Sequence, residues 1–152
     1  MSYKEKSIWA SFFVLIYLWC HYFLSVNALQ EAQSLTTSAI NTLLFIVVVK
    51  TIFLEVILQT IIAIIDYKQL DVKEDERDKL ISLYANRNAY WLLSLATPIA
   101  VFYTVIPTLS GYLYSNNDLP NEYIIMQLLI IVAVCAEVLR LGSQLFYYRV
   151  GS

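Results

Sequence analysis

Residues 39–65, AINTLLFIVVVKTIFLEVILQTIIAII, form a continuous apolar run that only two charged residues, Lys50 and Glu55, interrupt. An α-helix rises 1.5 Å per residue, so about 20 apolar residues are enough to cross the roughly 30 Å hydrocarbon core of a bilayer. Three further stretches satisfy this requirement: residues 7–25, 89–113 and 123–147. The sequence therefore predicts an all-α integral membrane protein built as a four-transmembrane-helix bundle.

The overall composition points to the same class of protein. Of 152 residues, 59% are hydrophobic and only 14% are charged, whereas about a quarter of the residues in a soluble domain are charged. The chain holds three glycines and three prolines, and it lacks the alternating ten-residue pattern of a transmembrane β-barrel. The net charge of −2 gives no support to nucleic-acid binding, which needs a basic surface. We expect one transmembrane domain over residues 1–152.

The distribution of lysine and arginine predicts how the chain crosses the membrane. Two lysines precede the first span, five basic residues lie between the second and third spans, and Arg149 follows the fourth. The loops at residues 26–38 and 115–122 contain no lysine or arginine. Because basic residues stay on the cytoplasmic side, we expect a multi-pass protein with both termini and the central loop in the cytoplasm.

The segment between the second and third spans, residues 66–87, holds six acidic and five basic residues. Its acidic residues favour a helix start, and apolar residues then recur at helical spacing up to the membrane. We expect the third helix to begin near Val72, so that a cytosolic extension over residues 72–88 emerges about 20 Å from the bilayer. This extension is either a solvated helix with internal ion pairs or a docking surface for a cytosolic regulatory protein. The docking residues would be Asp75, Glu76, Arg77, Asp78 and Arg87.

Four charged residues lie inside predicted spans, where each costs roughly 2.5 to 3.5 kcal/mol at a helix centre. Lys50 and Glu55 are on the second span, and Glu137 and Arg140 are on the fourth. We expect all four to form a buried charge cluster in which Glu55 pairs with Arg140 and Lys50 pairs with Glu137. Further hydrogen bonds would come from polar neighbours: Gln59, Gln144, Thr51 and Ser143. The cluster either holds two helices in register or forms a site for an ion, a proton or a small charged ligand.

The remaining chemistry-bearing residues are few. His21 is the only histidine, and it is either pH-responsive or a packed neutral side chain. Cys20 and Cys135 are not spaced as a CxxC pair and are predicted to be buried apolar side chains. A metal site or cofactor is therefore not expected. The chain also lacks GxSxG, HExxH and phosphate-binding glycine motifs, so we expect no enzyme activity.

The stretch DERDKLISLYANRNAYW, residues 75–91, together with Tyr148, Arg149 and Gly151, resembles an uncharacterised bacterial family of small four-span inner-membrane proteins. Its members share a cytosolic DERD-type motif before the third span and a basic YRRG-like end, from which this chain departs at Val150. The resemblance implies a location in the bacterial inner membrane and no particular reaction. Members are often encoded beside helix-turn-helix transcription regulators, which implies a sensing or regulatory role by analogy.

Two functions follow from these patterns. The leading hypothesis is a non-enzymatic inner-membrane protein that senses or signals, with the cytosolic acidic helix as its contact for a partner. The alternative is a small ion- or proton-coupled transporter or channel subunit, acting as a homo-oligomer, in which Glu55 and Glu137 exchange a proton or cation. An enzyme that acts on lipid at the inner interface is a third class.

Overall fold

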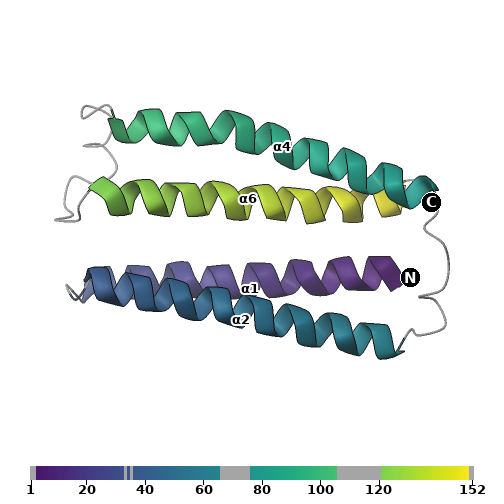
Figure 1. The fold of residues 1–152 in the computed structure, drawn as a ribbon, viewed down its shortest axis with the longest axis horizontal. Coiled ribbons are helices and arrows are strands. Elements are labelled where there is room, and N and C mark those ends of the chain that lie inside the picture. Colours follow the sequence, from purple (N-terminus) through teal and green to yellow (C-terminus); the bar gives the residue numbers. More distant parts are fainter. Residues whose placement is uncertain (1–2, 33, 35, 66–75, 106–120, 151–152) are drawn as a thin grey trace.

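Within the residues that the structure describes, which are 3–32, 34, 36–65, 76–105 and 121–150, the chain forms four long α-helices. The structure is a computed structural model. Helix α1 spans Tyr3–Glu31, α2 spans Thr37–Ile65, α4 spans Glu76–Val105 and α6 spans Asn121–Val150. Successive helices run antiparallel, so the start of α1 and the end of α6 lie at the same end of the bundle (Figure 1).

Local sequence explains where α2 begins and favours the described first turn of α4. The side-chain oxygen of Thr36 accepts a 3.3 Å hydrogen bond from the backbone N–H of Ala39, which caps the first turn of α2. Glu76 and Asp78 lie in the first described turn of α4, where negative charge is favourable beside the positive end of the helix dipole.

Three of the described helices are long and apolar enough to cross a membrane: Tyr3–Glu31, Ser38–Ile65 and Ile125–Val150. They contain the predicted spans 7–25 and 39–65 and all but the first residues of 123–147. The predicted third span, 89–113, is helical as far as Val105 within α4, and its last residues lie outside the described part of the chain.

The helices form two hairpins, α1–α2 and α4–α6, which contact each other through α1 and α6. Helix α2 packs on α1, α4 packs on α6, and α1 packs on α6; among the described helices no other pair packs to a comparable extent. At the end where α6 begins, the Gln127 side-chain amide donates a 2.7 Å hydrogen bond to the fully buried Tyr22 hydroxyl of α1. Between α4 and α6 the buried residues include Ala85, Ala89 and Ala136, whose small side chains allow close helix packing.

The outer surface of the bundle is rich in large apolar side chains. Large hydrophobic side chains are exposed on all four helices, among them Phe13, Phe53, Phe102 and Phe146, each more than half exposed. A water-soluble protein rarely exposes continuous apolar surface of this extent. The distribution is that of a membrane protein, in which lipid covers the outside of the helices.

The first turns of α4 are not a free-standing extension. Residues 76–88 are helical, as expected, but Ile81 and Ala85 are buried, and the rings of Tyr84 and Tyr147 lie 6.0 Å apart. This part of α4 runs beside the end of α6, which is itself helical to Val150. Residues 76–88 thus have one face packed on the bundle and the rest exposed or partly exposed. The predicted start near Val72 lies outside them.

Candidate functional site

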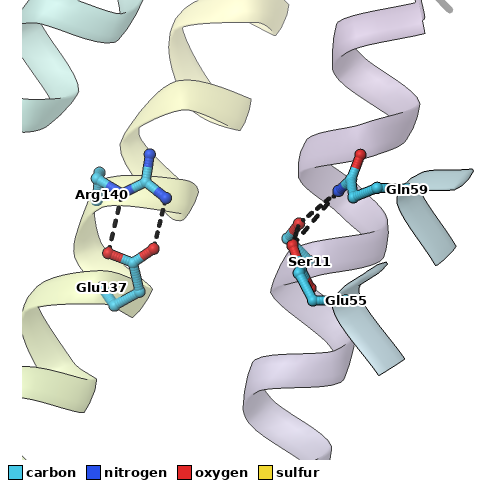
Figure 2. Close-up of polar contacts among 5 residues, drawn as sticks. All are labelled: Ser11, Glu55, Gln59, Glu137 and Arg140. Carbon is cyan, nitrogen blue, oxygen red and sulfur yellow. Dashed lines mark hydrogen bonds and ion pairs between the residues drawn. The ribbon is translucent and has the colours of Figure 1, made fainter. Parts of the chain in front are cut away.

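Glu137 and Arg140 form a bidentate ion pair within α6. The Arg140 Nε donates a 2.9 Å hydrogen bond to Oε2 of Glu137, and Nη2 donates a second one to Oε1 (Figure 2). The spacing of three residues places both side chains on one helix face. Neither is buried, because the side chain of Glu137 is 41% exposed and that of Arg140 is 32% exposed. Both line a groove of about 250 Å³ between α4 and α6, together with Asn86, Tyr90 and Leu93.

Glu55 takes part in a separate polar cluster between α1 and α2. It accepts hydrogen bonds from the Ser11 hydroxyl and, at 3.4 Å, from the Gln59 amide (Figure 2). The same amide donates to Ser11 at 3.0 Å, and the Ser7 hydroxyl donates to Oε1 of Gln59 at 2.6 Å. Two serines four residues apart on α1 thus meet an acid and an amide four residues apart on α2. We call this group of four residues the α1–α2 polar cluster.

The predicted pairing of charges across the second and fourth spans is wrong. Glu55 is close enough for its charge to act on Arg140 through space. Within the described residues, however, neither Glu55–Arg140 nor Lys50–Glu137 forms an ion pair. The physical reason is the order of the helices: α1 packs between α2 and α6, so the acid on α2 meets the serines of α1 instead.

The polar neighbours of the predicted cluster are also divided. Thr51 donates to the backbone carbonyl of Val47 on its own helix, at 2.8 Å. Ser143 accepts a 3.3 Å hydrogen bond from the Asn88 amide of α4. Gln144 is the member that is buried, at 7% exposure, and it lines a cavity near the chain termini rather than the middle of the bundle. The residues of the predicted single cluster are thus divided among six separate local arrangements.

Lys50, His21 and the two cysteines all lie on outer surfaces. Lys50 and His21 are exposed and line the same groove between α2 and α1. Cys20 and Cys135 are also exposed, which corrects the prediction that both are buried. In a bilayer an apolar thiol on the outside of a helix contacts lipid tails, so hydrophobicity alone does not require its burial.

The end of the bundle that holds both chain termini contains a second polar site. Asp78 forms a 3.3 Å ion pair with Lys4 of α1 and accepts a 2.8 Å hydrogen bond from the Tyr148 hydroxyl of α6. A cavity of about 210 Å³ lies between these three helices, lined by Asp78, Lys4, Tyr148, Ser7 and Gln144 among others. Asp78 is therefore the residue at which α1, α4 and α6 are tied together, a role that sequence periodicity does not reveal.

The other predicted docking residues point outward or lie beyond the described chain. Glu76, Arg77 and Arg87 are exposed, and the Arg87 guanidinium lies 5.0 Å from the centre of the Tyr84 ring. Asp75 lies outside the described residues. At the same end of the bundle, Arg149 lies over the ring of Trp9, at 5.6 Å. The described part of the DERD-type motif thus has one inward-facing residue, Asp78, and two that are available at the surface.

The described residues contain no group of three or more histidine, cysteine, aspartate or glutamate side chains placed to hold a metal ion. No family model matches the chain, and no curated protein and no solved structure matches it either. The resemblance to the four-span bacterial family consequently stays a prediction, and function is argued below from the geometry of this chain.

Proposed function

We propose that this chain is a non-enzymatic protein of the bacterial inner membrane that acts in sensing or regulation by binding a cytosolic partner protein through the first turns of α4. In this proposal four helices cross the membrane, with α4 as the third span and both termini in the cytoplasm. The positions of the basic residues in the sequence support this orientation. The observation that carries the proposal is the free face of α4 near its start.

That face has the spacing of a helix that docks into a groove. Leu80, Leu83, Tyr84 and Arg87 follow the i, i+3, i+4, i+7 pattern of helix-in-groove recognition. Leu80 and Leu83 are 52% and 59% exposed, and Tyr84, which is 40% exposed, lies at the border of this face beside Tyr147 of α6. The opposite face of the same turns is buried against the bundle, so α4 is held in place while this surface stays open.

The depth of these residues is what makes their exposure informative. Asp78 bonds to Lys4 at the start of α1 and to Tyr148 near the end of α6, so the first turn of α4 lies level with both chain ends. The predicted third span begins at Ala89, so Leu80 and Leu83 precede it by nine and six residues, or about 13 and 9 Å of helix. In this proposal both residues therefore lie outside the hydrocarbon core, where lipid tails do not cover them.

The charges around this face suggest the chemistry of the partner. Among residues 76–88 of α4, the exposed charged side chains are three basic ones, Arg77, Lys79 and Arg87, and one acidic one, Glu76. Asp78 adds little to the outer charge, because Lys4 neutralises it. The matching surface is an apolar groove with an acidic rim on a cytosolic protein.

Site-specific photo-crosslinking in cells that produce the protein tests this proposal. A benzophenone amino acid replaces Leu83 in one variant and Phe102, a lipid-facing control residue on the same helix, in another. We expect a discrete protein adduct from position 83 only. The captured protein, once purified, should bind the wild type in nanodiscs saturably, and Leu83→Asp should weaken binding about tenfold or more, as loss of a buried apolar anchor does.

Two results would contradict the proposal. One is that position 83 yields only lipid adducts, as position 102 should. The other is a pH-dependent cation flux in reconstituted vesicles that Glu137→Gln abolishes, which would identify a transporter instead. Glu137 is suited to that comparison because it lines a surface groove while Glu55 is enclosed by the α1–α2 polar cluster.

A further inference from the structure

A groove of about 640 Å³ runs between α1 and α2, near the middle of the length of both helices. Its walls are mainly aliphatic and aromatic side chains, and three polar side chains also line it: Tyr17, His21 and Lys50. Tyr17 and His21 are four residues apart and so lie on one face of α1. The volume falls within the range of about 300 to 1,000 Å³ that small-molecule sites occupy, and the mostly apolar lining with a few polar groups is typical of them.

Lys50 distinguishes this groove from an ordinary lipid-facing surface. It lies at the middle of α2, where a lysine cannot reach the headgroups as it does near a helix end. Within the described chain its ammonium group forms no hydrogen bond and no ion pair. The other three intramembrane charges have close partners: Glu137 and Arg140 pair with each other, and Glu55 bonds to Ser11. The groove therefore contains a positive charge that the described residues do not neutralise.

We propose that the α1–α2 groove binds a long-chain fatty carboxylate from the surrounding bilayer. The carboxylate would pair with Lys50, with His21 and Tyr17 as further hydrogen-bond donors, and the alkyl chain would lie against apolar residues such as Val47 and Phe53. A positive charge at mid-bilayer depth in an apolar groove favours a ligand that is both anionic and lipid-soluble. A single-chain fatty acid can enter the hydrocarbon core in its protonated form, whereas the phosphodiester of a two-chain phospholipid stays charged and is held at headgroup depth.

This site is distinct from the proposed docking face of α4 and does not depend on it. The two lie on different hairpins, and the groove is formed by α1 and α2 alone. A failure of the partner-binding experiment would leave the groove proposal intact, and the converse also holds.

Photolabelling of the full-length protein in phosphatidylcholine vesicles tests the groove. The probe is a palmitate analogue that carries a diazirine on its alkyl chain, with unlabelled oleate and oleyl alcohol as competitors. We expect saturable labelling of peptides that contain residues 17–21 or 43–54, displaced by oleate and not by the uncharged alcohol. Lys50→Met should reduce labelling about tenfold, because it removes the charge pair and keeps the side-chain length.

Further variants distinguish the contribution of the Lys50 charge to labelling from that of the space in the groove. Lys50→Arg should keep most of the labelling, and Lys79→Met, which removes an exposed lysine on α4, should keep all of it. Leu43→Trp should reduce labelling by filling the groove while leaving Lys50 in place. Circular dichroism and size-exclusion chromatography check whether each variant is folded, and Leu43→Trp and Lys50→Arg keep the test decisive if Lys50→Met does not fold.

Three outcomes would overturn the proposal. In the first, Lys50→Met is labelled as strongly as the wild type. In the second, oleyl alcohol competes as well as oleate, or the label spreads over exposed residues outside the groove such as Ile57 and Ile61, which indicates ordinary lipid contact. In the third, a lipid-soluble carbodiimide joins Lys50 of one copy to an acidic side chain of another, which identifies the groove as an interface between copies of the chain.

Discussion

The Tyr148 hydroxyl, near the end of α6, donates a 2.8 Å hydrogen bond to Oδ1 of Asp78 in the first turn of α4. Seventy residues separate the two along the chain. Asp78 belongs to the DERD-type stretch and Tyr148 to the basic end, the two fragments on which the predicted resemblance to a four-span bacterial family rests. The hydrogen bond brings these two fragments together at the end of the bundle, where Lys4 of α1 joins them.

Tyr148→Phe removes the hydroxyl that donates this hydrogen bond and keeps the aromatic ring. We expect a loss of about 1 kcal/mol in the free energy of unfolding, the typical net value of one hydrogen bond. Hydrogen exchange should also become faster in the first turns of α4, because one of their ties to α6 is lost. Unfolding in mixed detergent micelles and exchange measured by mass spectrometry check the two effects.

Tyr90→Phe serves as the control for this variant. Tyr90 lies on the same helix as Asp78 and is 68% exposed, so removal of its hydroxyl should leave both measurements unchanged. Equal effects of the two substitutions would mean that the Tyr148–Asp78 bond does not hold α4 to α6.

The ion pair between Glu137 and Arg140 predicts a rescue between two substitutions. Arg140→Met leaves Glu137 with an unpaired charge among apolar helices, and we expect it to lower the free energy of unfolding by about 2 kcal/mol. Addition of Glu137→Gln removes the unpaired negative charge of Glu137, so the double variant should be more stable than Arg140→Met alone. Unfolding of the single and double variants in a double-mutant cycle measures the coupling.

A strictly additive cycle would contradict this prediction. Lys79→Met provides the matched control, since Lys79 is an exposed base and forms no side-chain ion pair with the described residues. Its combination with Glu137→Gln should be additive.

The α1–α2 polar cluster predicts that shape matters more than charge at position 55. Glu55→Gln keeps an oxygen that can accept from Ser11, so its free energy of unfolding should stay within about 1 kcal/mol of the wild-type value. Glu55→Leu leaves the Ser11 hydroxyl and the Gln59 amide with fewer partners and should cost about 1 to 3 kcal/mol more than Glu55→Gln.

Ser11→Ala tests whether the loss in Glu55→Leu comes from the unpaired Ser11 hydroxyl. In Glu55→Leu this hydroxyl has lost its acceptor, and Ser11→Ala removes the hydroxyl itself. The double variant should therefore lose less free energy of unfolding than the sum of the two single losses. A Glu55→Leu variant as stable as Glu55→Gln would show that the cluster contributes nothing to the packing of α2 on α1. Steric trapping in bicelles is a suitable measure of unfolding for this series.

The proposed orientation predicts an asymmetric pattern of chemical labelling. In a background in which Cys20 and Cys135 are replaced by alanine, Asn27→Cys places a thiol near the end of α1, and Lys79→Cys places one near the start of α4. A membrane-impermeant maleimide should label the first in intact spheroplasts and the second only after permeabilisation. The reverse pattern would place both termini outside the cytoplasm and remove the basis for a cytosolic partner.

Much of the local structure could be predicted from the sequence. The apolar runs at 7–25 and 39–65 lie within helices α1 and α2, because a chain in lipid must satisfy its backbone hydrogen bonds within each span. The helical character of residues 76–88 was likewise evident from apolar spacing. What spacing did not reveal was that the inner face of this stretch packs on the end of α6.

The charged residues show where this kind of prediction fails. Counting residues along the helices placed Glu55 and Arg140 at similar depth, and the two are close enough to interact through space. Depth does not determine which helix lies beside which, however, and α1 supplies the partner of Glu55 through Ser11. The one available signal was the four-residue spacing of Ser7 and Ser11, which matches that of Glu55 and Gln59.

The sequence by itself determined that this is a chain of long apolar helices suited to a membrane, because hydrophobicity and helix length are properties of each segment alone. Only the tertiary structure decided the partners of its charges: Ser11 for Glu55, Arg140 for Glu137, and Lys4 with Tyr148 for Asp78. The physical reason is that lipid tails are as apolar as leucine, so hydrophobicity does not select which helix faces pack together. Close packing and hydrogen bonds between specific side chains make that selection.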